Sequence, residues 1–175
     1  RDSPIFRPIQ TSEQEAFVRQ ATPIPEPQPA QSKEAIRDRA IGALVGLAVG
    51  DAVGTTLEFA PRDDTARKLT DMVGGGPFRL QPGQWTDDTA MAIALGYSLQ
   101  NCGKLNEHDL LTRFVAWWRE GAYSCTGTCF DIGTTTSASL SAYEQTKNIV
   151  AGSSHAQSSG NGSLMRLAPV AIRYW

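Results

Sequence analysis

Two adjacent aspartates open the most regular apolar stretch of the chain, residues 83–99, GQWTDDTAMAIALGYSL. Apolar residues follow them at a spacing of four, which is the repeat along one face of an α-helix, and Gly103 ends the run. The pattern therefore predicts a helix that begins directly after Thr86, with Asp87 and Asp88 in its first turn. The apolar positions are Met91, Leu95 and Leu99.

Two interpretations of Thr86, Asp87 and Asp88 are open. Threonine and aspartate favour helix starts, because they cap free N–H groups and suit the positive end of the helix dipole. The same side chains are oxygen ligands, and adjacent carboxylates repel each other unless a cation such as Mg²⁺ lies beside them. Four other features favour a metal site: Gly50-Asp51, Glu58, Asp131 and the sequence SSGNGSLMR at residues 158–166.

Composition and charge exclude several classes of protein. The 175 residues are 41% hydrophobic and 19% charged, which predicts one soluble domain with a core. The net charge of −2, the pI near 5.7 and the lack of a Lys/Arg run argue against nucleic acid or an anionic membrane as a partner. The longest apolar run, residues 40–50, is shorter than the roughly 20 residues that span a bilayer. A signal peptide is not recognisable either, so we expect a cytoplasmic protein.

Cysteine and histidine are too sparse for a disulfide framework or a zinc cluster. Cys102, Cys125 and Cys129 are odd in number and contain no CxxC pair, which predicts buried free thiols. His108 and His155 are the only histidines, so an imidazole-rich metal site is poorly supplied. Any metal chemistry is therefore expected to use oxygen ligands.

Residues 1–31 differ from the rest of the chain and hold six of its 10 prolines. Within them, residues 12–20 have the serine and glutamate of a capping box, which predicts one short helix. Residues 22–29 have proline at every second position from Pro23, which favours an extended polyproline segment. The segment is either a disordered linker or an arm that docks on its own domain or on a partner.

Residues 32–49 are predicted to form a helix capped by Ser32, along which glycine recurs at every fourth position. Glycine inside a helix costs about 0.5–1 kcal/mol relative to alanine, so a stripe of glycines predicts very close packing in a soluble helical core. Asp51 follows, where a carboxylate is unfavourable for the helix dipole. It has either a hydrogen-bonded structural role or a place near a cation. The glycines are Gly42, Gly46, Gly50 and Gly54.

The remaining chain alternates loops with helical patterns. Residues 62–83 are rich in glycine and proline, and residues 106–120 have the cap and apolar spacing of a buried helix. A loop over residues 122–133 carries Asp131, either as a simple helix-entry acid or as a site residue, before a Thr/Ser-rich helix. The glycine-rich turn at residues 158–162 resembles an anion-binding nest. No alternating strand pattern of useful length occurs, so the sequence predicts an all-α fold.

Four motifs in this order resemble the N-terminal half of the ADP-ribosylglycohydrolase family, which includes the dinitrogenase reductase-activating glycohydrolases. They are GALVGLAVGDAVGTTLEF, GQWTDDTAM, FDIGTTTSASL and SSGNGSLMR, and the resemblance covers residues 36–175. It implies an all-α fold around a site for two Mg²⁺ ions, with Mn²⁺ as an alternative. The implied activity is hydrolysis of the bond between ADP-ribose and an acceptor, often a protein arginine.

The resemblance also implies roles for particular residues. Thr86, Asp87 and Asp88 would be metal ligands, and Glu58 would be a further ligand or a general base. Asp131 matches the aspartate that holds the guanidinium in arginine-specific members, so the expected catalytic residues are Glu58, Asp87 and Asp131. The phosphates of ADP-ribose would be cradled by Ser159, Gly160, Asn161 and Gly162.

One departure from the family pattern concerns the remaining metal ligands. The family supplies them from a late Asp-x-Asp-Thr/Ser motif, which residues 168–175 do not provide. We therefore expect residues 32–175 to be the N-terminal portion of the domain, preceded by the arm of residues 1–31. The chain alone would then be an incomplete enzyme.

Two further functions compete with the hydrolase. Some relatives are immunity proteins, and residues 1–31 could occlude the active site of an ADP-ribosyltransferase toxin. The third interpretation is a catalytically silent family member, against which the intact Thr86-Asp87-Asp88, Glu58 and Asp131 argue.

Overall fold

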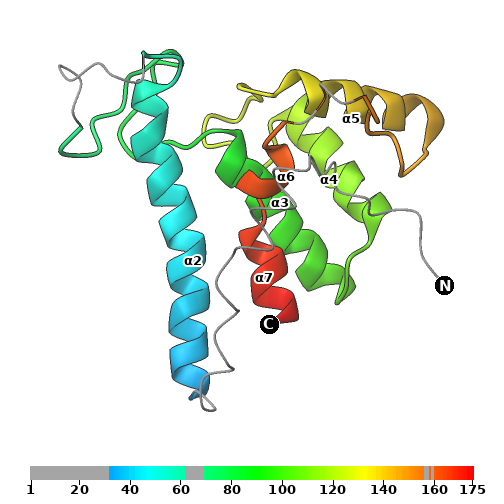
Figure 1. Ribbon diagram of the computed structural model, residues 1–175, viewed down its shortest axis with the longest axis horizontal. Coiled ribbons are helices and arrows are strands. Elements are labelled where there is room, and N and C mark those ends of the chain that lie inside the picture. The colour runs from blue at the N-terminus through cyan, green and yellow to red at the C-terminus, as the bar shows by residue number, and fades with distance from the viewer. Residues whose placement is uncertain (1–31, 62–68, 156–157, 159) are drawn as a thin grey trace, which may run out of the picture. The chain divides into compact units, whose positions relative to one another are not determined.

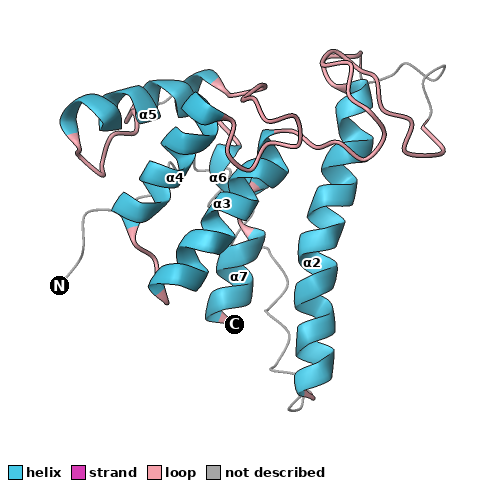
Figure 2. Ribbon diagram, turned by 180° about the vertical axis from the view of Figure 1, so that it is seen from behind, coloured by secondary structure: helices cyan, strands magenta, loops and turns pink. Residues whose placement is uncertain are grey.

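The computed structural model describes residues 32–61, 69–155, 158 and 160–175 (Figure 1). Helices joined by loops make up this part of the chain, and the one β-bridge found there joins Gly75 to Leu80 (Figure 2). The all-α prediction is therefore confirmed. The elements are α2 (Lys33–Gly54), the 3-10 turn η1 (Thr55–Leu57), α3 (Asp87–Cys102), α4 (Glu107–Glu120), α5 (Thr134–Thr146), α6 (Gly162–Met165) and α7 (Ala168–Tyr174).

Helix α3 is the centre of the packing. Helices α4, α6 and α7 contact it, and α5 packs on α4 (Figures 1 and 2). The sequence of α3 explains its position, because small and apolar residues repeat around it and most of its side chains are buried. The buried core consists of Ala90, Met91 and Ala94 from α3, Phe114 and Trp117 from α4, and Leu140 from α5.

Helix α4 begins and ends as its sequence predicts. The Asn106 side chain accepts a hydrogen bond from Asp109 N at 3.1 Å, and Gly121 ends the helix at φ +72°. The predicted buried face includes Phe114 and Trp117, which are buried, and four further apolar residues that are only partly buried. These four residues lie at the edge of the core: Leu110, Leu111, Val115 and Trp118.

Helix α2 starts as predicted but ends later. Ser32 Oγ accepts a hydrogen bond from Ala35 N at 3.2 Å, which confirms the cap. The helix continues past Val49 to Gly54 and so includes Asp51, where we expected the helix to have ended. The carboxylate is tolerated there because donors at the start of α3 satisfy it.

The predicted close packing along the glycines of α2 is not borne out. A Cβ built on Gly42, Gly46, Gly50 or Gly54 meets no atom within 4 Å in the described part of the chain. Apolar side chains of α2 are exposed instead, with Val45 54% exposed. The physical reason is that α2 shares few contacts with the other described helices, so nothing there uses its smooth face.

The apolar run of residues 40–50 lies within a longer helical segment than the run itself indicated. Lys33–Leu57 has a mean hydropathy of 1.6 in its most apolar window and is long enough to span a bilayer. A single helix of this kind is a weak indication, because the core helix of a soluble protein has similar length and composition.

Three further predictions concern residues 1–31, the cysteines and two helices. The short helix and extended segment predicted within residues 1–31 lie outside the described residues. Cys102, Cys125 and Cys129 are free thiols as predicted, but they are partly buried rather than buried. Helices over residues 87–102 and 134–146 agree with the predicted apolar spacing.

Candidate active site

The start of α3 is held by a carboxylate from α2. Asp51 accepts hydrogen bonds from Thr86 N and Thr89 N, both at 3.0 Å. It also accepts the hydroxyls of Thr86 at 2.8 Å and Thr89 at 2.6 Å. The structure thus supports the structural role that the sequence left open for Asp51, whose partners lie more than 30 residues away in the chain and could not be found from spacing.

Thr86 occupies the N-cap position of α3, and Asp87 and Asp88 are its first two residues. The Thr86 side chain makes no capping hydrogen bond within the helix. Plain capping by Thr86 is therefore wrong, although both aspartates do lie at the positive end of the helix dipole. Thr86 and Asp87 are 5% and 8% exposed, so neither is an ordinary solvated first-turn residue.

Glu58 and Asp131 come from two separate loops that an aromatic contact brings together. Glu58 ends the 3-10 turn η1, and Asp131 lies in the loop before α5. The ring of Phe78 packs against the neighbours of both residues: its centroid is 6.2 Å from that of Phe59 and 5.3 Å from that of Phe130. The two carboxyl groups interact, because Asp131 raises the pKa of Glu58 and Glu58 lowers that of Asp131.

Glycine is required at one position beside Glu58. Gly76 has φ +65°, and a Cβ built there would lie 2.6 Å from the Thr55 carbonyl oxygen in η1. Any larger residue would push the loop away from the turn that carries Glu58.

Four predicted site residues form one acidic cluster, in which each pKa is raised. Burial is the main cause and raises the pKa of Glu58 to about 7, with Asp131 adding to the effect. Burial likewise raises the pKa of Asp87 to about 8, helped by Asp131 and Asp88. The pKa values of Asp88 and Asp131 are raised for the same reason, opposed by hydrogen bonds within the cluster. Asp51 adds negative charge to all of them.

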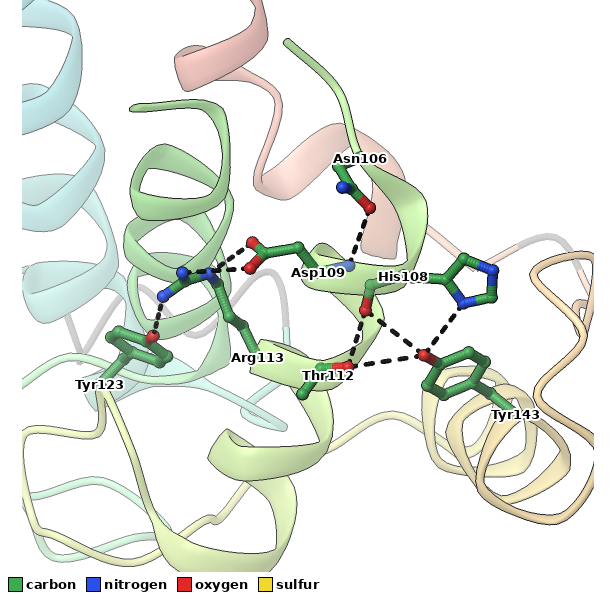
Figure 3. Close-up of polar contacts among 7 residues, drawn as sticks. All are labelled: Asn106, His108, Asp109, Thr112, Arg113, Tyr123 and Tyr143. Atoms are coloured by element: carbon green, nitrogen blue, oxygen red, sulfur yellow. Dashed lines mark hydrogen bonds and ion pairs between the residues drawn. The ribbon is translucent and has the colours of Figure 1, made fainter. Parts of the chain in front are cut away.

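The loop that carries Asp131 is also tied to the residue before Thr86. Trp85 Nε1 donates to the Tyr123 carbonyl at 3.3 Å, and Cys125 Sγ donates to the Trp85 carbonyl at 3.0 Å. Arg113 of α4 donates to the Tyr123 hydroxyl at 2.9 Å (Figure 3). Asp131 itself adopts φ +59°, a conformation that aspartate tolerates better than most residues. Helix α4 thereby holds the loop in place through the side chain of Arg113.

A cavity of about 370 Å³ joins Asp87 to the predicted anion-binding turn. Gly160, Asn161 and Gly162 line it, as does Arg166. Ser159, predicted to belong to this turn, lies outside the described residues. The start of α5 completes the wall with Thr134, Thr135 and Thr136.

Arg166 lies in the motif SSGNGSLMR, but the sequence alone indicated no role for it. Its guanidinium lies 4.9 Å from the centre of the Phe114 ring, and Nη1 is 3.4 Å from Met91 Sδ. Burial lowers the pKa of Arg166, and the negative charge of Asp87 opposes that effect. The arginine therefore brings positive charge to a cavity whose other walls are acidic, hydroxyl-bearing and apolar.

The donor chemistry of the cluster fits a hard divalent cation. In the described ranges, no group of three or more Asp, Glu, His or Cys side chains is arranged so that by itself it could hold a metal ion. Burial raises the pKa values of Asp87 and Asp88, and the charge of neighbouring carboxylates adds to the effect. A divalent cation would neutralise negative charge in this place. The cluster is consistent with part of a ligand set. The residues that would contribute are Thr86, Asp87, Asp88 and Glu58.

The fold and the cluster define an all-helical protein with an acidic site built at the start of one helix and on two loops. The chain matches the ADP-ribosylglycohydrolase family over residues 32–175 and belongs to it.

Relatives and a solved structure agree with this family. The chain is 50% identical over 135 residues to "ADP-ribosylarginine hydrolase Tri1" of Serratia proteamaculans (strain 568), covering 77% of this chain and 36% of the relative. It is 39% identical over 140 residues to "ADP-ribosyl-[dinitrogen reductase] glycohydrolase" of Rhodospirillum rubrum, covering 78% and 45%. A solved "ADP-ribosylglycohydrolase-related protein complex" is 40% identical, with a TM-score of 0.66, and 79% of this chain and 43% of that one are covered. The chain thus spans less than half the length of these relatives.

Proposed function

We propose that the protein hydrolyses the N-glycosidic bond between ADP-ribose and an arginine side chain of a modified protein. The observation that carries this proposal is the convergence of Glu58, Asp87, Asp88 and Asp131 in a chain of this family. The printed names of the relatives from Serratia proteamaculans and Pseudomonas putida, each 50% identical to this chain, support arginine as the acceptor.

The residues of the cluster suit separate tasks in such a reaction. Cleavage of a glycosidic bond passes through an oxocarbenium-like centre and needs an activated water. Glu58, with its pKa raised to about 7, can accept a proton from water near neutral pH. Asp131 can pair with the guanidinium in the bidentate manner that distinguishes arginine from lysine or serine.

The cavity between Asp87 and α6 suits the ADP-ribose moiety. Arg166 provides positive charge there, and Gly160 to Gly162 place backbone close to the cavity. A phosphate group is the part of the substrate that such a wall would hold.

We include Mg²⁺ in the proposal, with Thr86, Asp87, Asp88 and Glu58 as the residues that would hold it and Mn²⁺ as an alternative. When bound, the cation would neutralise the cluster and polarise the oxygens of water and ribose. Further ligands belong to no residue identified in the described part of the chain.

The experiment is to supply peptides ADP-ribosylated on arginine and, separately, on serine, and to follow release of ADP-ribose by mass spectrometry. We expect release from the arginine conjugate, with an unmodified arginine peptide as the second product. Release from the serine conjugate alone would contradict the assigned acceptor. Intact conjugates in both reactions, with protein shown to be folded, would contradict the activity.

The alternative of an immunity protein that blocks a toxin depends on residues 1–31. These lie outside the described residues, so the alternative stays a prediction. Deleting residues 1–31 would abolish inhibition of the transferase if the arm occludes its active site, whereas a linker could be removed without effect.

A further inference from the structure

The N-terminus of α3 is capped by a residue from another helix. A threonine at the N-cap position normally accepts the N–H of the third helical residue with its own hydroxyl. Here that residue is Thr89, and its N–H is bonded to Asp51 of α2 at 3.0 Å. Asp51 also accepts the N–H of Thr86 itself, at 3.0 Å from each carboxylate oxygen. Asp51 therefore accepts the capping hydrogen bond that the N-cap side chain would normally accept.

This arrangement determines the direction in which the Thr86 hydroxyl donates its single hydrogen. Thr86 Oγ1 donates it to Asp51 Oδ1 at 2.8 Å. A hydroxyl has a single hydrogen and two lone pairs, so a donated hydrogen leaves the lone pairs for another partner. Thr86 is 5% exposed, and among the described residues no hydrogen bond to its lone pairs is found. A buried hydroxyl with free lone pairs stands directly before two carboxylates.

Asp51 itself is poorly suited to bind a cation. Oδ1 accepts from Thr86 N and Thr86 Oγ1, and Oδ2 accepts from Thr86 N, Thr89 N and Thr89 Oγ1. Both oxygens are thus occupied by donors, whereas a ligand needs a lone pair directed at the metal.

We propose that Asp51 is a positioning residue, which caps α3 in place of Thr86 and thereby presents the Thr86 hydroxyl oxygen to a divalent cation. The inference rests on the proposed function, because it requires a cation beside Asp87 and Asp88. It adds that the ligand geometry depends on a carboxylate outside the acidic cluster. Outer residues that orient a ligand in this way usually contribute about 10–100-fold to metal affinity.

The competing explanation is that Asp51 only anchors α2 to α3. Thr89 distinguishes the two explanations. Its hydroxyl bonds to Asp51 at 2.6 Å and takes no part in the bond between Thr86 and Asp51. Thr89→Val removes an anchoring bond and keeps the shape of the side chain. Asp51→Asn replaces one of the two accepting oxygens with an NH₂ that cannot accept, so the Thr86 and Thr89 groups cannot all keep their bonds to this side chain.

The test is calorimetric titration of Mg²⁺ into the metal-free protein and into folded Asp51→Asn and Thr89→Val. We expect Asp51→Asn to raise the Kd by about 10–100-fold. Thr89→Val is expected to change the Kd by less than about threefold, within the scatter of indirect effects. An unchanged Kd in Asp51→Asn, or an equal rise in both variants, would overturn the inference. Failure of the unaltered protein to bind Mg²⁺ would instead overturn the cation itself and with it the inference.

A double-mutant cycle tests whether Asp51 acts through Thr86. Thr86→Val should lose as much affinity as Asp51→Asn or more, and the double variant should lose no more than Thr86→Val. Additive losses would show that Asp51 acts by another route. If Asp51→Asn does not fold, Thr86→Ser and Thr86→Val decide: serine keeps the hydroxyl that Asp51 orients and should retain affinity. Equal affinities of these two variants would overturn the inference.

Discussion

The carboxylate of Asp109 on α4 and those at the start of α3 lie in opposite electrostatic environments. On α4, Asp109 receives Arg113 Nε at 2.7 Å and Nη2 at 3.2 Å (Figure 3). The guanidinium lowers the pKa of Asp109, so its negative charge is compensated. At the start of α3, burial raises the pKa values of Asp87 and Asp88, and neighbouring carboxylates add to the effect.

This difference shows which charged groups help to hold the helices together. The polar contacts of α4 join one helix to its neighbours: Arg113 reaches the Tyr123 hydroxyl on one side, and Tyr143 contacts His108 and Thr112 on the other (Figure 3). Among the described residues, no ion pair of this kind is found in the acidic cluster, and unneutralised carboxylates destabilise a buried site. A site that keeps such groups has a use for negative charge, and a bound cation is the simplest one.

The largest effect on activity is expected when negative charge is removed from the acidic cluster. Asp87→Asn or Asp88→Asn should lower hydrolysis of ADP-ribosyl-arginine by orders of magnitude, because each removes an anionic oxygen ligand. Folding should be largely unaffected, since repulsion within the cluster is relieved. Steady-state kinetics with thermal unfolding as the control checks this, and full activity in either variant would remove the metal assignment.

Asp131 should affect the acceptor more than the ADP-ribose. Losing one partner of a charge-assisted pair costs about 1.5–3 kcal/mol, or roughly 10- to 150-fold in affinity for an arginine conjugate. Binding of free ADP-ribose should barely change in Asp131→Ala. Calorimetry with both ligands measures the difference, and an equal loss for the two would rule out a role in acceptor selection.

Stability should depend on pH with a sign set by the cluster. Glu58 and Asp87 hold protons more tightly when folded, because burial raises their pKa values from 4.5 to about 7 and from 3.8 to about 8. The unfolded chain releases these protons first, so without divalent cations the Tm should fall as the pH rises from about 5 to about 8.

Added Mg²⁺ should lessen this fall by favouring the ionised carboxylates. Scanning calorimetry with and without Mg²⁺ measures both effects. A Tm that rises over this range, or that responds to pH identically with the cation present, would contradict the prediction.

The smallest effect is expected on α4. Asp109→Asn should lower the free energy of unfolding by less than about 1 kcal/mol, because the ion pair with Arg113 is partly exposed. Catalysis should fall far less than in Asp87→Asn, since Asp109 reaches the loop of Asp131 only through Arg113 and Tyr123. Urea unfolding and kinetics of this variant provide the matched control for Asp87→Asn. A loss of activity as large as that of Asp87→Asn would end the distinction between the two regions.

The sequence predicted the helices of the core because their signals are local. The cap at Asn106, the apolar spacing of α3 and the glycines that end both helices each lie within one element. The acidic motif at Asp87 and Asp88 was found in the same way, together with the family resemblance.

Contacts between distant segments were beyond such patterns. The bond from Asp51 to Thr86 joins α2 to α3, and the stacking of Phe59, Phe78 and Phe130 joins two loops. The spacing of glycines in α2 was misleading, because it indicates which face is smooth but not what packs against it. Tertiary partners, rather than local propensity, decide these features.

The most direct test of the central claim is the cation dependence of hydrolysis. The protein is treated with excess EDTA, assayed on an arginine ADP-ribosylated peptide, and assayed again after Mg²⁺ is returned in excess over the chelator. If the cluster holds a catalytic cation, hydrolysis stops in EDTA and is restored by Mg²⁺ in the unaltered protein and in Asp109→Asn, but not in Asp87→Asn. Full hydrolysis in EDTA by folded protein would contradict the claim that the uncompensated carboxylates serve a cation.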